Sequence, residues 1–138
     1  MTQKEQVAVV TGSSSGIGLE ISLMLARNRF HTYAGMRKLE EGKSKHIKDI
    51  AKNENLPLQV IQLDVDNDKS VLDAINKIIS EKDRIDVVVN NAGYALVGPL
   101  EETSMEEIKA QFETNFFGAV RVMQAVIPVM RGIINFTT

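Results

Sequence analysis

A run of small residues near the amino end of the chain has the composition of a phosphate-binding turn. It lies between a Val-rich run and an amphipathic stretch, and reads Thr11-Gly12-Ser13-Ser14-Ser15-Gly16-Ile17-Gly18. Glycines permit a tight turn and let the backbone approach a pyrophosphate, and the first N–H groups of a following helix have no intrahelical partner. The run therefore predicts a site for a phosphate-containing ligand, although the same residues also suit a plain helix start with serine caps.

Polar residues also follow three other apolar runs, at points where strands would end. They are Arg37, the pair Asp64-Val65 and the run Asn90-Asn91-Ala92-Gly93. In doubly wound sheets, ligands bind at the carboxyl ends of the strands, so these residues are expected close to the glycine-rich turn. Simpler roles stay open: Asp64 and the two asparagines can cap turns, and Arg37 can be a solvated residue.

These positions are carried by short apolar runs that alternate with longer amphipathic stretches. The Val- and Ile-rich runs predict buried strands over residues 7–10, 32–36, 58–63, 85–89 and 133–136. Helical spacing of apolar residues predicts helices that begin near residues 17, 39, 68 and 104, the last extending to 130. Asp68 is the expected N-cap of the third helix, and Thr103 with Glu106 has the spacing of a capping box. The alternation predicts a single α/β domain over residues 1–138 with a parallel sheet.

Taken together and in this order, the motifs resemble those of the short-chain dehydrogenase/reductase family. Besides the glycine-rich turn, Asp64-Val65 and the Asn-Asn-Ala-Gly run, the resemblance includes Asn115 within Thr114-Asn115-Phe116-Phe117-Gly118. It covers essentially the whole chain. It implies a Rossmann-type doubly wound parallel sheet in a three-layer α/β/α sandwich, with strand order 3-2-1-4-5 and the chain ending after the fifth strand. It also implies a nicotinamide dinucleotide cofactor and, in a complete enzyme, an oxidoreductase acting on the alcohol or carbonyl group of a small molecule.

The resemblance further implies which residues contact the cofactor. They would shape the pyrophosphate turn, donate to phosphate oxygens, bind the adenine or line the ribose, and they are Thr11, Gly12, Ser13, Ser15, Gly16, Ile17, Gly18, Asp64, Val65, Asn90, Ala92 and Gly93. Within this set, the hydroxyls of Ser13 and Ser15 are expected to donate to phosphate, and Asp64 is expected to accept from the adenine amino group.

The end of the second expected strand bears on the choice between NAD and NADP. A carboxylate there accepts from the ribose 2′-hydroxyl of NAD. Here the position is held by Met36, followed by Arg37, and the next carboxylate is Glu40. A guanidinium can pair with a 2′-phosphate. We therefore predict that NADP(H) is preferred over NAD(H), although the glycine-rich turn carries no second basic residue.

Asn115 is the member of the family's catalytic tetrad that maps onto this chain. The resemblance implies a local distortion of the helix, whose backbone holds a water of the proton relay; the alternative is a solvated Asn on an amphipathic helix. The family's Tyr-x-x-x-Lys pair is absent, because neither Tyr33 nor Tyr94 has a lysine four residues on. The family's substrate-orienting serine corresponds to Thr137 or Thr138, so a threonine holds its position here. We expect the chain alone to bind cofactor without turnover.

Composition argues against several other classes of protein. The net charge of −2 is unsuited to binding nucleic-acid phosphates. The absence of cysteine excludes a disulfide scaffold and Cys-ligated metals, and no metal site is expected. No apolar stretch approaches the length of a membrane span, and the protein is expected to be cytoplasmic. His31 and His46 are expected to be surface residues without a catalytic role.

A different class of function also stays open, namely a non-catalytic dinucleotide-binding or interaction domain. The predicted helix over 104–130 carries an apolar stripe and two apolar residues off it: Phe112, Phe116, Val120, Met123, Ile127 and Met130, then Phe117 and Val122. A helix that is apolar on more than one face needs a second surface to bury it. We therefore expect a homo-oligomer formed through residues 104–130.

Overall fold

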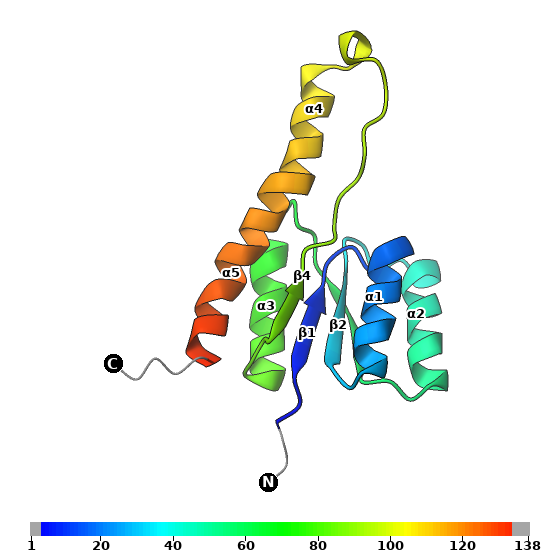
Figure 1. The fold of residues 1–138 in the computed structure, drawn as a ribbon, viewed down its shortest axis with the longest axis vertical. Coiled ribbons are helices and arrows are strands. Elements are labelled where there is room, and N and C mark those ends of the chain that lie inside the picture. Colours follow the sequence, from blue (N-terminus) through cyan, green and yellow to red (C-terminus); the bar gives the residue numbers. More distant parts are fainter. Residues whose placement is uncertain (1–3, 134–138) are drawn as a thin grey trace.

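The computed structural model describes residues 4–133, which form a four-stranded parallel sheet between two layers of helices (Figure 1). The strands are β1 (Val7–Val10), β2 (His31–Met36), β3 (Leu58–Gln62) and β4 (Val87–Val89). They are ordered β3-β2-β1-β4, and each neighbouring pair is parallel. The predicted doubly wound sheet is therefore confirmed for its first four strands.

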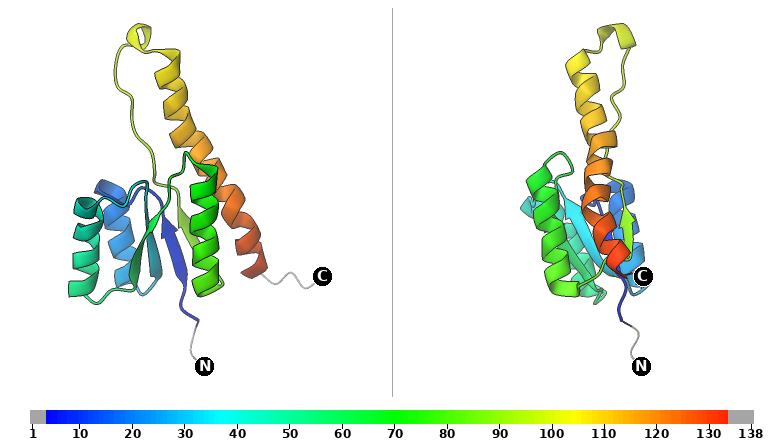
Figure 2. Two further views of the ribbon diagram at one scale, coloured as in Figure 1. Left: turned by 180° about the vertical axis from the view of Figure 1, so that it is seen from behind. Right: turned by 90° about the vertical axis from the view of Figure 1, so that its left-hand side faces the viewer.

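The helices cover both faces of the sheet. On one face lie α1 (Gly16–Arg27) and α2 (Glu41–Asn53), and on the other lie α3 (Asp68–Lys82) and α5 (Ala119–Ile133), as Figure 2 shows. Successive residues of β2 point to opposite faces, so Tyr33 packs in the same core cluster as Ile78 while Met36 packs in the other with Ile47. Every residue of β1 is fully buried, because the central strand is covered on both sides.

The segment between β4 and α5 leaves the body of the domain at the carboxyl ends of the strands. It contains η1 (Leu100–Glu102), α4 (Met105–Phe112) and η2, a π-helix over Glu113–Gly118 that continues into α5. Figure 1 shows α4 standing beyond the end of the sheet. We call residues 90–112 the arm. The single helix predicted over 104–130 is thus three consecutive segments, with the irregular one at Asn115 and Gly118.

The fifth predicted strand, over 133–136, lies outside the described residues except for Ile133. That residue is the last of α5, so its assignment to a strand is wrong. The helical apolar spacing of Val126, Val129 and Met130 continues to position 133 and explains the longer helix. The order 3-2-1-4-5 is therefore observed for the first four strands.

Two predicted helix caps are wrong by one residue. Asn67, rather than Asp68, caps α3, and its side chain accepts from the N–H of Ser70 at 2.9 Å. At the start of α4 the capping box begins at Ser104 rather than at Thr103. In both places an adjacent residue had an equally suitable side chain, and the backbone conformation decided between them.

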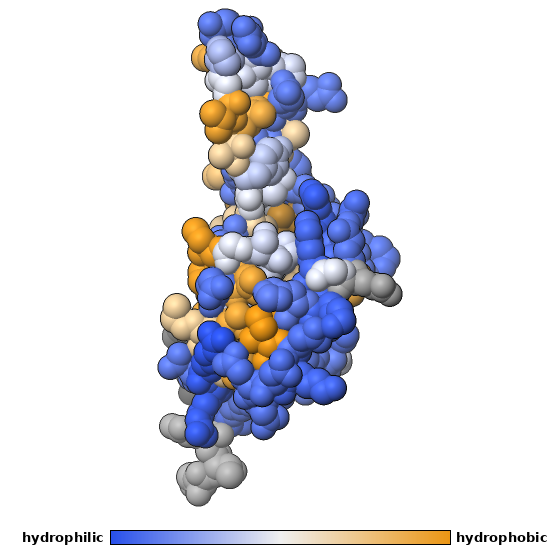
Figure 3. All heavy atoms as spheres, turned by 90° about the vertical axis from the view of Figure 1, so that its right-hand side faces the viewer, coloured by the Kyte–Doolittle hydropathy of each residue, from blue (hydrophilic) through white to orange (hydrophobic). Residues whose placement is uncertain are grey.

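Apolar side chains are exposed on the arm and along η2 and α5. Figure 3, seen from the side of α1 and α2, shows apolar side chains on the arm among polar ones. Of the apolar residues predicted on this helix, Val122 is fully buried, whereas Phe112 and Phe116 are 57% and 56% exposed. Of the two residues off the predicted stripe, Val122 therefore faces the core, whereas Phe117 is 51% exposed. Within residues 4–133, no helix combines the length and the hydropathy needed to cross a membrane.

Candidate functional site

A cleft of about 650 Å³ opens at the carboxyl ends of the strands, beside the base of the arm. The loops that follow all four strands contribute to it, together with η2, and its lining comprises Gly12, Ser14, Ser15, Ile17, Arg37, Leu63, Asp64, Val65, Asp66, Asn91, Ala92, Gly93, Tyr94 and Thr114. Most of the predicted cofactor-binding residues are in this lining. The predicted residues outside it are Thr11, Ser13, Gly16, Gly18, Asn90 and Asn115.

The glycine-rich turn is folded tightly against the loop after β4. Gly12 has φ +67°, and a Cβ there would lie 2.9 Å from the Cα of Ala92, so both the backbone conformation and the space require glycine. A Cβ on Gly18 would lie 2.2 Å from the Gly12 carbonyl oxygen, which shows how closely α1 approaches the turn. The N-cap Ser15 makes no side-chain hydrogen bond to this helix. The N-terminus of α1 thus retains N–H donors suited to an anionic ligand.

Two hydroxyls of the glycine-rich turn make hydrogen bonds within the protein. The Thr11 hydroxyl oxygen accepts from the N–H groups of Asn91 at 3.0 Å and Ala92 at 2.9 Å. The Ser13 hydroxyl is fully buried and donates to the carbonyl of Val10 at 2.9 Å. This geometry does not fit the expected donation from the Ser13 side chain to phosphate, because the hydroxyl is already engaged. Ser14 and Ser15 are the serines of the turn that line the cleft.

Asn91 connects the loop after β4 to the glycine-rich turn, a role that the sequence did not predict for it. Its side-chain amide donates to the carbonyls of Thr11 and Gly12, each at 3.1 Å. The neighbouring Asn90 is exposed and does not line the cleft. The Asn-Asn-Ala-Gly run signalled the position, but which asparagine faces the turn depends on how the chain leaves β4.

The loop after β3 forms a second wall of the cleft. The Asp64 carboxylate lines it and also accepts from the N–H of Asp66 at 3.0 Å, so Asp64 does stabilise its own turn. The Asp64 N–H donates to the hydroxyl of Ser70 at 2.9 Å, which anchors the loop to the first turn of α3. Val65 is buried but contributes to the cleft wall.

Arg37 is exposed at the end of β2 and lines the cleft. Among the described residues it makes no ion pair, and its carbonyl accepts from the side-chain amide of Gln62 at 3.5 Å. Met36, the residue before it, is buried. Within residues 4–133, Arg37 is the only cation in the cleft lining, where the carboxylates are those of Asp64 and Asp66.

Asn115 lies within η2 and holds the base of the arm. Its side-chain oxygen accepts from the N–H of Tyr94 at 3.0 Å, and its amide nitrogen donates to the Tyr94 carbonyl at 2.7 Å. A Cβ on Gly93 would lie 2.9 Å from that oxygen. The expected distortion of the helix at Asn115 is confirmed, since the residue sits in a π-helix. Thr114, next to it, lines the cleft.

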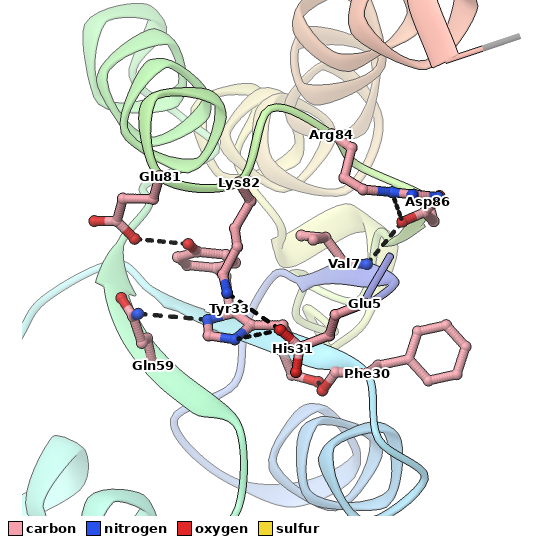
Figure 4. Close-up of polar contacts among 11 residues, drawn as sticks. Glu5, Val7, Phe30, His31, Tyr33, Gln59, Glu81, Lys82, Arg84 and Asp86 are labelled. Atoms are coloured by element: carbon pink, nitrogen blue, oxygen red, sulfur yellow. Dashed lines mark hydrogen bonds and ion pairs between the residues drawn. The ribbon is translucent and has the colours of Figure 1, made fainter. Parts of the chain in front are cut away.

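The other tyrosine and the histidines lie away from the cleft. At the amino end of the sheet, the Tyr33 hydroxyl donates to Glu81 at 2.6 Å (Figure 4), and burial raises the pKa of this phenol above its usual value. The His31 side chain is 12% exposed, so its prediction as a surface residue is wrong, whereas His46 is exposed. No group of three or more potential metal ligands occurs within residues 4–133.

Comparisons with known proteins agree with this geometry. The sequence profile of the short chain dehydrogenase family matches residues 6–136. Retinol dehydrogenase 8 from Bos taurus is 45% identical over 136 residues, which cover 95% of this chain and 42% of the relative. A 3-ketodihydrosphingosine reductase from Bacteroides thetaiotaomicron is 38% identical, with coverage of 91% and 42%.

Solved structures give the same result. A metagenomic short-chain oxidoreductase in complex with NADP has a TM-score of 0.84 at 26% identity, covering 93% of this chain and 57% of that one. Actinorhodin polyketide ketoreductase with NADPH also has a TM-score of 0.84, at 27% identity, with coverage of 94% and 49%. The chain spans less than half the length of the curated relatives described above. On the match of profile, sequence and fold, the chain belongs to the short-chain dehydrogenase family.

Proposed function

We propose that this chain is the NADP(H)-binding portion of a short-chain dehydrogenase/reductase. The observation that carries the proposal is Arg37, which lies exposed at the end of β2 in a cleft whose opposite walls are the glycine-rich turn and the Asp64-Val65 loop. The parent activity would be hydride transfer to or from a small alcohol or carbonyl compound. Bound NADP(H) would supply the hydride acceptor or donor.

The residues of the cleft fit the chemistry of a dinucleotide. Gly12 and Gly18 leave no space for side chains at the turn, so a pyrophosphate could approach backbone N–H groups and the α1 N-terminus. Ser14 and Ser15 add hydroxyl donors. The Asp64 carboxylate would accept from the adenine amino group, and Ala92 and Gly93 would line the ribose. The Arg37 guanidinium would pair with the 2′-phosphate.

The cofactor preference can be tested by calorimetric titration of NADPH and NADH. The wild-type chain should bind NADPH more tightly, and Arg37→Asp should remove that preference by losing a charge-assisted contact of about 1.5–3 kcal/mol. Lys48→Asp is the matched control, because it makes the same charge reversal at an exposed site on α2. Tighter NADH binding by the wild type, or an unchanged preference in Arg37→Asp, would contradict the proposal.

Turnover requires groups beyond those in the cleft. Tyr94 lines it without a lysine four residues on, and Asn115 uses its amide to hold the Tyr94 backbone. The positions expected for a substrate-orienting hydroxyl, Thr137 and Thr138, lie outside the described residues. We infer that the 138-residue chain binds cofactor without catalysis. Alcohol-dependent NADP reduction by the purified chain would refute this.

A second proposal concerns self-association through residues 104–130. It is supported by the exposed aromatic side chains Phe112, Phe116 and Phe117, and by Met123 and Ile127, which are each 40% exposed. Exposed apolar surface of this kind favours association. Light scattering of the chain with and without NADPH separates this from cofactor binding: a dimer that Phe116→Ser converts to monomer supports it, and a monomeric wild type refutes it.

A further inference from the structure

Arg121, in the first turn of α5, reaches back to the loop between β3 and α3. Its guanidinium donates to the carbonyl of Val65, to the Asp68 carboxylate and, at 2.6 Å, to the Glu113 carboxylate. The side chain is 21% exposed, so these bonds are partly shielded from water. One residue therefore connects the loop that forms a wall of the cleft, the start of α3 and the first residue of η2.

η2 contacts the same loop at two further points. The Thr114 hydroxyl donates to the Asp66 carboxylate at 2.9 Å. A Cβ on Gly118 would lie 2.7 Å from the Val65 side chain, so the helix and the loop are in close contact there. Since Asn115 also holds the backbone of Tyr94 after β4, η2 is bonded to the loops that follow β3 and β4.

We propose that Arg121 is a positioning residue for the adenine side of the cleft, acting through the Val65 carbonyl to fix the Asp64–Asp66 loop against η2. The inference rests on the proposed cofactor function. Arg121 does not line the cleft, whereas Asp64, Val65 and Asp66 do. Its effect on a ligand must therefore pass through the loop that it holds.

The side chain suits this task because a guanidinium offers several donors in one plane. Here it serves three acceptors on three separate elements. A lysine at this position keeps the charge but is a compact point charge without the planar fork, so it cannot reproduce all three contacts. Arg121→Lys thus separates the geometry of the contact from the long-range attraction of a positive charge for a phosphate.

The test uses two ligand fragments and calorimetry. Adenosine 2′,5′-bisphosphate probes the adenine side, and inorganic pyrophosphate probes the glycine-rich turn. In Arg121→Lys the affinity for adenosine 2′,5′-bisphosphate should fall about tenfold, while the affinity for pyrophosphate should stay within about twofold. Arg29→Lys is the matched control, an exposed arginine in the turn before β2 at the opposite end of the sheet. Equal losses for both fragments, or no loss for either, would overturn the proposal.

Two further measurements keep the outcome decisive. If Arg121→Lys does not fold, Thr114→Val serves in its place, because it removes one hydroxyl contact to the same loop. It should lower the affinity for adenosine 2′,5′-bisphosphate by less than about tenfold. Amide hydrogen exchange at Val65 and Asp66, measured without ligand, should accelerate in Arg121→Lys. If the wild type binds neither fragment, the proposed function fails; if it binds both and the variant matches it, only the role of Arg121 fails.

Discussion

The two ends of the sheet use polar residues in opposite ways. At the amino end, polar side chains are paired with one another: Arg84 bonds Asp86, whose carboxylate also accepts from the Val7 N–H at 2.7 Å, and Tyr33 bonds Glu81 (Figure 4). At the carboxyl end, several polar groups that line the cleft, among them the Arg37 side chain, have no side-chain partner within residues 4–133.

The difference separates groups that stabilise the fold from groups that remain available to a ligand. Paired polar groups cost stability when one partner is removed, because the other is left unsatisfied. Open donors at a cleft contribute little to stability and can bind a phosphate. Substitutions at the amino end should therefore change the free energy of unfolding, and substitutions at the cleft should change affinity.

The largest effect is expected at Gly18, where the cleft also depends on packing. A methyl group there would lie 2.2 Å from the Gly12 carbonyl oxygen and 2.4 Å from the Asn91 amide nitrogen, so Gly18→Ala must displace the turn. We expect NADPH affinity to fall about a hundredfold, equivalent to about 2.7 kcal/mol. Calorimetric titration measures it.

The matched control is Gly42→Ala in α2, where an added Cβ would have no atom within 4 Å. It should keep NADPH affinity and raise stability slightly, since alanine is favoured over glycine in helices. If Gly18→Ala binds NADPH as the wild type does, the turn is not the phosphate site and the contrast between the two ends is lost.

At the amino end, Asp86→Ala should lower stability and leave NADPH affinity unchanged. The substitution leaves the buried-strand Val7 N–H and the Arg84 guanidinium without their acceptor, at a cost of about 2 kcal/mol. Urea unfolding measures the loss. Asp86→Asn, which can still accept from Val7, should lose less. If Asp86→Ala changed NADPH affinity but not the free energy of unfolding, the amino end would contribute to ligand binding rather than to stability.

The same carboxylate gives a pH dependence with a definite sign. Burial opposes ionisation of Asp86, but hydrogen bonds from Arg84 and the Val7 N–H outweigh it, and its pKa lies below the usual 3.8. A carboxylate whose pKa is lower in the folded state stabilises the protein at pH values above its unfolded-state pKa. This contribution is lost as the pH falls through the folded-state pKa. The acid limb of stability should therefore be less steep in Asp86→Asn.

Much of the carboxyl end was predictable because the glycine spacing and the residues at strand ends are local patterns in the sequence. The turn from Gly12 to Gly18 and the pair Asp64-Val65 lie where their spacing indicated. Sequence could not indicate that the Ser13 hydroxyl faces Val10, since that depends on the path of the chain through the turn. It also missed Arg121, because its contacts to Val65 and Asp68 join positions 56 and 53 residues apart and no local spacing indicates them.

Most of the polar contacts at the amino end could not be predicted from the sequence, because they also join distant positions. The pairs Tyr33–Glu81 and Val7–Asp86 join positions 48 and 79 residues apart, and no local spacing indicates such contacts. His31 was predicted to lie on the surface because no carboxylate and nucleophile stand at a suitable spacing from it. Its ring instead packs beside Tyr33, with ring centroids 5.2 Å apart.

The smallest effect is expected from His31 and concerns pH alone. Burial and the nearby Lys82 lower the pKa of His31 below 6.5, and the opposing influence of Glu5 and Glu81 is weaker. The Gln59 amide lies 3.4 Å from the His31 ring nitrogen Nε2, which can accept a hydrogen bond from it while the ring is neutral. Below pH 6.5 the unfolded chain binds this proton more readily, so stability should fall as the pH falls through that range.

Unfolding in urea at about pH 7.5 and about pH 5.5 tests this, because carboxylates stay largely ionised between those values. His31→Gln should lose less stability than the wild type on acidification, and His46→Gln should match the wild type because His46 is exposed. NADPH affinity at pH 7.5 should be the same in all three proteins. An equal acid loss in His31→Gln and His46→Gln would mean that His31 does not couple proton binding to folding, and the pH dependence of the amino end would then rest on Asp86 at lower pH.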